Sequence, residues 1–107
     1  MEQIGLGTEL KINVHIEPIG DLHMSDYDFS AKFYTRAVKS VVAHKEDMIQ
    51  VDADNYIALV DTSNMTTGVV MMVVTAQIPD ADFPDGLRTE TTMPINTNIS
   101  IVKSWDA

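Results

Sequence analysis

The chain of 107 residues contains no cysteine. Disulfides, thiolate metal sites and cysteine nucleophiles are therefore excluded. Basic residues are also few: 7 lysines and arginines stand against 16 aspartates and glutamates, which gives a formal net charge of -9. This balance argues against nucleic acid as a partner, because phosphate binding needs a basic surface. It also disfavours docking on anionic lipid.

Long hydrophobic runs are missing as well. The longest, Val69 to Val74, spans six residues, whereas a membrane-spanning helix needs about 20. The first ten residues carry two acids and no basic cluster before an apolar run, which is not the pattern of a signal peptide. We therefore expect a protein that is synthesised in the cytoplasm and has no membrane partner.

Apolar residues are plentiful, at 45% of the chain. A chain of this length and composition can bury a core without disulfides or metals, and it is too short for two ordinary domains. We therefore expect a single domain over residues 1–107, with its core at about 9–103. Gly5 and Gly7 lack the rest of a phosphate-binding fingerprint, so we expect flexible chain at the N-terminus.

Alternation of apolar and polar residues is the clearest pattern. Glu9 to Ile16 and Tyr27 to Thr35 both show the period of two that is typical of a half-buried strand. Val69 to Gln77 is almost continuously apolar, which predicts a central strand covered on both faces. Shorter strands are predicted at Lys39–Ala43, Met48–Val51, Tyr56–Val60, Leu87–Met93 and Asn98–Lys103.

One segment, Tyr34 to Ile49, also fits the spacing of a helix face. A helix there would lack a good N-cap residue outside the preceding strand, and the pair Val41-Val42 favours a pleated surface. We therefore predict a strand followed by a turn at His44–Asp47, with the helix as the alternative. Seven to eight short strands separated by turns indicate an all-β, antiparallel sandwich.

Acidic residues gather in two turn-like segments. Asp80, Asp82 and Asp85 have a spacing similar to that of a calcium loop, but Pro84 occupies a ligand position and no closing glutamate follows. The alternative is a hairpin loop in which aspartates bind the nearby backbone, and we prefer it. Asp52 to Asn55 is predicted to be a second turn.

No catalytic constellation is recognisable. His15, His23 and His44 are far apart and lack metal-ligand spacing, so we expect a solvated strand face for the first and loop positions for the others. No serine lies in a nucleophile-elbow motif. We therefore expect no enzyme activity, no cofactor and no metal.

Two stretches and a glycine carry a resemblance to a known family: Asp26–Tyr34, Val51–Thr62, and Gly68 before the long strand. They resemble small immunoglobulin-like proteins encoded by phages and prophages of gut bacteria, and the layout is similar to the N-terminal domain of phage baseplate upper proteins. The resemblance covers Leu10 to about Val102. It implies an immunoglobulin-like sandwich that serves as a virion part attaching fibres or receptor-binding proteins, and it supplies no catalytic residues.

We therefore expect a structural or adaptor module that works through protein–protein contacts, self-association included. The alternative is a carbohydrate- or cell-surface-binding module, for which Phe83 and Trp105 are the candidate aromatics. Ile99 and Ile101 lie in the last predicted strand, which we expect to be a sheet edge. Trp105 follows it, and tryptophan is enriched at binding hot spots. In the alternative arrangement, this strand pairs inside its own sandwich and Trp105 covers the end of the core.

Overall fold

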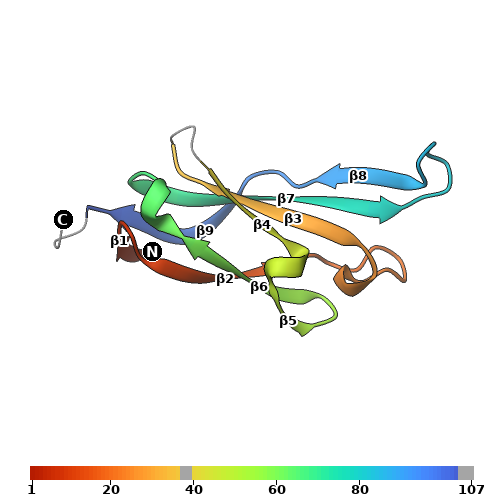
Figure 1. Cartoon of the computed structure of the whole chain (residues 1–107), viewed down its shortest axis with the longest axis horizontal. Helices are drawn as coiled ribbons and strands as arrows, with labels where there is room; N and C mark the ends of the chain where they lie inside the picture. The colour runs from red at the N-terminus through yellow and green to blue at the C-terminus, as the bar shows by residue number, and fades with distance from the viewer. Residues whose placement is uncertain (37–39, 104–107) are drawn as a thin grey trace.

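The computed structural model describes residues 1–36 and 40–103. Over these residues the chain is all-β, with two sheets packed face to face as an immunoglobulin-like sandwich, as predicted. The molecule is elongated, with principal extents of 52 × 27 × 22 Å. Figure 1 shows the strands running along its length.

Nine strands and three single turns of 3₁₀-helix make up the described part of the chain. The strands are β1 (Glu2–Gly5), β2 (Glu9–His15), β3 (Asp28–Tyr34), β4 (Ser40–His44), β5 (Ile49–Asp52), β6 (Asn55–Asp61), β7 (Gly68–Pro79), β8 (Leu87–Thr91) and β9 (Ile95–Val102). The 3₁₀ turns are η1 (Met24–Asp26), η2 (Lys45–Asp47) and η3 (Thr62–Asn64).

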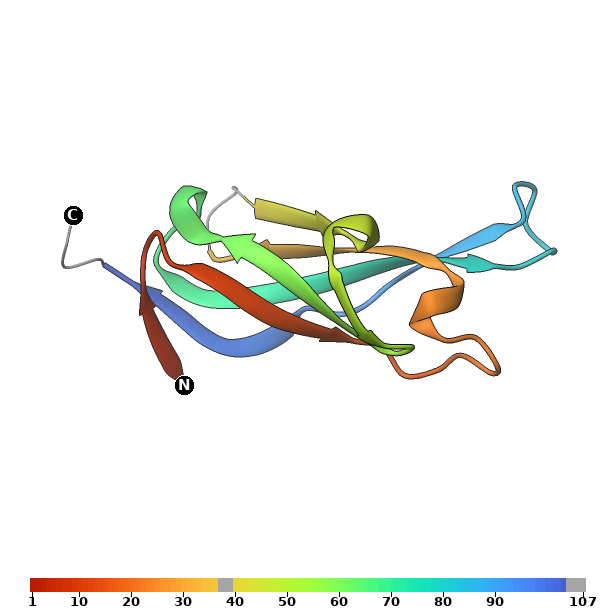
Figure 2. The same cartoon turned by 60° about the horizontal axis from the view of Figure 1, so that its bottom comes forward.

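The larger sheet has the order β1-β9-β7-β3-β4, and β8 pairs with the far half of β7. The smaller sheet has the order β2-β6-β5. All pairs are antiparallel except β1 with β9, which is parallel. Figure 2 shows the smaller sheet lying over the larger one, with the β7–β8 hairpin reaching beyond it.

The core lies between the two sheets and follows the alternation read from the sequence. Inward-facing residues are Ile12 and Val14 on β2, Phe29, Ala31 and Phe33 on β3, Tyr56, Ala58 and Val60 on β6, and Val70, Met72, Val74, Ala76 and Ile78 on β7. The ring of Phe29 meets that of Tyr56 edge-on at 5.1 Å between centroids, a favourable aromatic geometry. Sequence periodicity therefore identified the core residues of β2 and β3, whereas the buried faces of β6 and β7 became evident only in the structure.

The prediction that β7 is covered on both faces is wrong. Its residues alternate between buried and half-buried, because the smaller sheet packs on one face only. On the other face, Met71 and Val73 are half-buried beside Tyr34 and Lys32, their partners in register on β3. The continuous apolar run reflects a central strand with one face packed in the core and the other shielded by neighbouring side chains.

The helix alternative for Tyr34 to Ile49 is also wrong. The end of β3, β4, η2 and the start of β5 lie in the described part of this segment, and the one helical element there is the single 3₁₀ turn η2. The predicted flexible N-terminus is a strand instead. β1 pairs with β9 so that Ile4 lies opposite Ile101 and packs against the core. This pairing joins the two ends of the sequence, which a local pattern does not reveal.

Candidate interaction surface

The outer face of the smaller sheet carries a contiguous group of solvent-exposed apolar side chains. Leu59 is 53% exposed, Ile49 is 47% exposed, and Ile57 is half-buried. Ile57 lies directly opposite Ile49 on β5 and two residues before Leu59 on β6, so the three share one face of the sheet. We call Ile49, Ile57 and Leu59 the apolar face.

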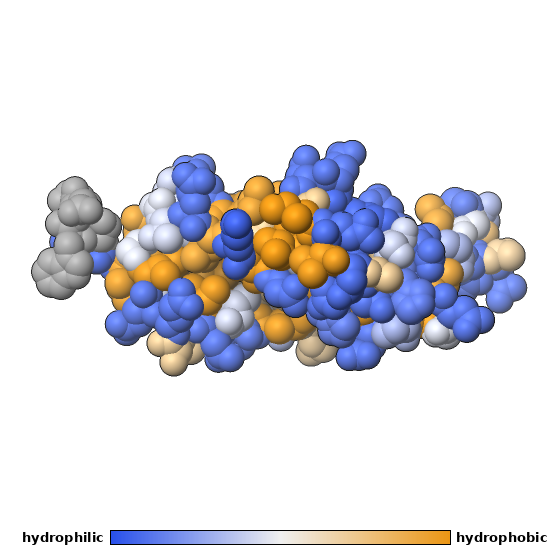
Figure 3. Space-filling model, turned by 90° about the horizontal axis from the view of Figure 1, so that it is seen from below, coloured by the Kyte–Doolittle hydropathy of each residue, from blue (hydrophilic) through white to orange (hydrophobic). Residues whose placement is uncertain are grey.

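Figure 3 views the side of the molecule on which β2 and β5 lie, and it shows apolar surface in the middle with hydrophilic surface around it. Val51, two residues after Ile49 on β5, is also exposed, at 57%. It sits at a bulge, where the register shifts between Gln50 and Asp52. A bulge and a short edge strand limit how far another strand can pair with β5. A partner would therefore bind this face mainly through its side chains, and less through the backbone of β5.

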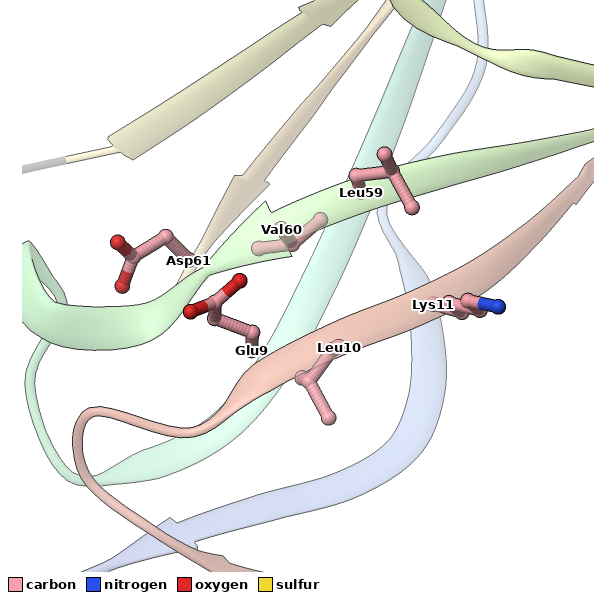
Figure 4. A pocket seen from close by; sticks show the side chains of 6 residues that line it. All are labelled: Glu9, Leu10, Lys11, Leu59, Val60 and Asp61. Carbon is pink, nitrogen blue, oxygen red and sulfur yellow. The ribbon is translucent and has the colours of Figure 1, made fainter.

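A shallow groove of about 240 Å³ lies beside Leu59, between β2 and β6. Its lining residues are Glu9, Leu10, Lys11, Leu59, Val60 and Asp61. In Figure 4 the carboxylates of Glu9 and Asp61 lie at one end of the groove, and Lys11 points away from them. The groove thus has an apolar middle and an acidic end.

Negative charge surrounds the apolar face. Glu9 and Asp61 are directly opposite each other in the β2–β6 register, and like charges in that position destabilise a strand pair. Two more acids, Glu46 and Asp47, lie in η2 just before β5, and Asp52 ends that strand. Lysine or arginine occurs only once in the three strands of this sheet, at Lys11.

Asp61 also has a local task, because its side chain accepts a hydrogen bond of 2.9 Å from the Ser63 N–H and caps η3. Hydrogen bonding from the Ser63 side chain, followed by that from its backbone N–H, holds the pKa of Asp61 below its usual value. Asp61 therefore stays ionised in neutral solution, and its charge contributes to the acidic end of the groove.

The residues predicted to form an unpaired edge are placed differently by the fold. β9 lies between β7 and β1, so the prediction that the last strand is an edge is wrong for the described residues. Ile101 is only 1% exposed and belongs to the core, while Ile99 is half-buried and packs against it. The alternative, in which this strand pairs inside its own sandwich, is the observed arrangement.

Phe83 is 43% exposed near the tip of the β7–β8 hairpin, and its role in an interaction stays a prediction. Figure 1 shows this hairpin at the end of the molecule opposite the N-terminus. Trp105, the remaining candidate, lies outside the described residues.

The acidic loop at 80–86 is the predicted hairpin loop. The Asp80 carboxylate accepts a hydrogen bond of 3.0 Å from the Asp82 N–H and lies 3.4 Å from the Arg88 guanidinium. Asp85 accepts from the Leu87 N–H at 3.1 Å. Among the described residues, no group of three or more His, Asp or Glu side chains is arranged to hold a metal ion. The expectation that this loop does not bind calcium stays a prediction.

Two of the three histidines converge on one residue, which the sequence reading missed. Asp54, in the β5–β6 turn, bonds His23 Nδ1 through its carboxylate at 2.8 Å and His15 Nδ1 through its backbone carbonyl at 2.8 Å. Glu17 holds the other ring nitrogen of His15 at 3.1 Å. No spacing rule links these positions, because the contacts join segments 31 and 39 residues apart.

These contacts change the acidity of both rings. The hydrogen bond to Glu17, helped by the Asp54 carbonyl, raises the pKa of His15 above 6.5, and the hydrogen bond to Asp54 raises that of His23. The Asn55 side chain, together with the Asp54 N–H, lowers the pKa of Asp52. The hydrogen bonds of His15 and His23 to Asp54 tie the β5–β6 turn to the β2–β3 region, so both histidines are engaged in structural contacts. We call these hydrogen bonds, together with that of His15 to Glu17, the clamp around Asp54.

A second groove, of about 250 Å³, lies between the β2–β3 connection and β7–β8. Its lining residues are Ile16, Ile19, Val74, Ala76, Glu90, Thr91 and Thr92. Glu90 is the one titratable group in this lining, and its carboxylate is bound by Arg88 at 3.1 Å. Acid–base chemistry of the kind glycosidases use requires two carboxyl groups, so this groove does not supply it.

Comparison of the chain with models of known protein families, with curated sequences and with solved structures found no match in any of the three. Within the part of the chain that the structure describes, no helix is long and apolar enough to span a membrane.

Proposed function

We propose that this protein is a non-enzymatic structural or adaptor module that works through protein–protein contacts. The observation that carries the proposal is the apolar face, where exposed Ile49 and Leu59 and half-buried Ile57 lie next to one another on one side of the sheet. Single exposed apolar residues are ordinary, but contiguous apolar patches rimmed by polar residues are typical of interaction sites. Burial of these side chains by a partner would supply binding energy in proportion to the area covered.

The setting we propose for this role is the virion of a phage or prophage. The resemblance of Asp26–Tyr34 and Val51–Thr62 to phage immunoglobulin-like proteins supports it. A sandwich alone does not distinguish functions, because one architecture serves many.

A carbohydrate-binding function receives less support from the described surface. Glycan-binding modules usually present two or three aromatic rings on one exposed face. Phe83 is the only aromatic among the described residues with more than a third of its area exposed, whereas the rings of Tyr27, Phe29, Phe33 and Tyr56 are buried. A single ring does not make a stacking platform.

The test is co-elution with defined partners. The protein is mixed with each purified product of the neighbouring genes, and the mass of any complex is measured by size-exclusion chromatography with light scattering. We expect one product to form a complex that Leu59→Lys weakens. Val42→Lys is the matched control, because Val42 is 50% exposed on the outer face of the other sheet.

A complex lost equally in both variants would contradict the assignment of the apolar face. If no product binds while a glycan array gives a specific signal, the adaptor function itself is wrong and the carbohydrate-binding alternative replaces it.

A further inference from the structure

We infer that the partner of the apolar face is a protein segment with an apolar ridge flanked by lysine or arginine, and that it is not a second copy of this chain. The inference rests on the proposed function and deepens it. Three features carry it: the small area of the face, the acids around it, and Lys11, which lies beside Leu59.

The area of the face limits the size of the partner. The three strands are at most seven residues long, so the sheet measures roughly 14 Å across and 23 Å along, or about 300 Å². A standard stable interface buries about 800 Å² on each partner. The face therefore fits a narrow element, such as one strand or hairpin of a neighbour, better than a broad domain surface.

The charge around the face decides the chemistry of that element. Glu9 and Asp61 oppose each other at one end without a cation bound between them among the described residues. Glu46, Asp47 and Asp52 lie at the two ends of β5. A cationic side chain of a partner, placed over Glu9 and Asp61, would relieve their mutual repulsion as well as adding its own attraction.

A second copy fits this face poorly. Each copy would bring the same acids, with Lys11 as the only lysine or arginine in the three strands, on a chain of net charge -9. Like-charge juxtaposition across an interface is unfavourable and suppresses association. The same charges that repel a copy attract a basic partner.

Lys11 lies directly opposite Leu59 in the β2–β6 register and forms no ion pair with the described residues. Lys11→Glu should therefore strengthen binding of a cationic segment, because it removes the lysine charge that lies beside Leu59. It would weaken a dimer that depended on Lys11 of one copy meeting the acids of the other. Lys11→Glu should thus strengthen binding if the occupant is a cationic segment and weaken it if the occupant is a second copy.

The experiment is a nuclear magnetic resonance titration of the full-length, ¹⁵N-labelled protein with three short peptides: alternating lysine and leucine, alternating lysine and serine, and alternating glutamate and leucine. We expect the lysine–leucine peptide to shift amide signals of β2, β5 and β6. Leu59→Thr should weaken its binding about tenfold, while Val42→Thr should leave it unchanged. Lys11→Glu should tighten it, and added salt should weaken it through screening. The spectra themselves show whether each variant is folded.

Three results would overturn the inference. The first is that the glutamate–leucine or lysine–serine peptide binds as tightly as the lysine–leucine peptide. The second is that the shifts fall on β3, β4 and β7. The third is that signals of β2, β5 and β6 move on dilution without peptide, which would make a second copy the occupant. If one of these occurs but a neighbouring gene product still binds, the adaptor function stands and only the partner chemistry is wrong.

Discussion

Phe33 is the largest side chain among the fully buried residues of the described chain. It lies on β3 between Val41 of β4 and Met72 of β7 in the sheet register. Phe33→Ala should lower the free energy of unfolding by about 3–5 kcal/mol, because it removes buried area and leaves a cavity. Urea denaturation of the two proteins measures the difference.

Phe83→Ala is the matched control, since Phe83 is a half-exposed ring on the hairpin. We expect a change of no more than about 0.5 kcal/mol there. Equal losses in the two variants would mean that Phe33 does not pack as described.

Lys45 joins η2 to the start of β3. Its ammonium donates hydrogen bonds to the carbonyls of Tyr27 at 2.8 Å and Ser25 at 3.1 Å, and it lies 5.7 Å from the centre of the Phe29 ring. Lys45→Met keeps much of the aliphatic stem but removes the donors, so we expect a loss of about 1–3 kcal/mol. Lys32→Met should cost less, because the Lys32 ammonium lies over the Tyr34 ring and forms no hydrogen bond or ion pair with the described residues. A thermal melt of each variant checks the order.

The clamp around Asp54 makes the β2–β3 connection sensitive to pH. His15 and His23 have pKa values raised above 6.5, so each binds its proton more tightly in the folded protein than in the unfolded chain. Their stabilisation is therefore complete below about pH 6.5 and is lost as the pH rises through the raised pKa. Asp52 and Asp61 act in the opposite sense: their lowered pKa values give stabilisation above about pH 3.8 that is lost on acidification.

Together these groups contribute most to stability between about pH 4 and pH 6.5, and the contribution of the histidines declines as the pH rises through their raised pKa values. The double variant His15→Gln/His23→Gln should flatten that decline in urea titrations at several pH values. His44→Gln, a change at an exposed histidine of β4, is the control. A decline that persists in the double variant would show that the clamp does not cause it.

The β7–β8 hairpin carries the calcium prediction. Asp80 and Asp85 already bind the backbone of their own loop, and Arg88 lies beside Asp80. Calcium would have to compete with these bonds, and Pro84 offers no side-chain ligand. We expect thermal melts in calcium and in chelator to overlap. A rise of several degrees in calcium would reveal binding to the native state and would contradict the prediction.

At the scale of the whole molecule, charge governs association. The self-association expected from the sequence relied on an unpaired last strand, but β9 is paired on both sides. A net charge of -9 then favours a monomer at low ionic strength, because copies repel one another beyond contact distance. We expect sedimentation equilibrium to give 11.8 kDa at low salt. A dimer at low salt would count against the charge argument and against a cationic partner for the apolar face.

Local patterns in the sequence determined much of this fold. Alternation in Glu9 to Ile16 and Tyr27 to Thr35 identified β2, β3 and their buried residues, because a pleated strand points successive side chains to opposite faces. Asp85 and Gly86 identified the β7–β8 turn, where Gly86 has φ near +75°, a conformation that glycine adopts without steric cost. Both signals depend only on neighbouring residues.

The surface and the strand partners were decided by the tertiary structure. No pattern of neighbouring residues in the sequence shows that Ile101 is buried beside β1. Nor does any such pattern show that Asp54 forms hydrogen bonds with two histidines of the β2–β3 region. Ile57 and Leu59 were correctly predicted to lie in a strand. The predicted strand did not show which of its two faces would be buried in the core. Which face stays in solvent depends on how distant strands pair and how the two sheets stack. Those contacts join segments far apart in sequence, so only the folded chain determines them.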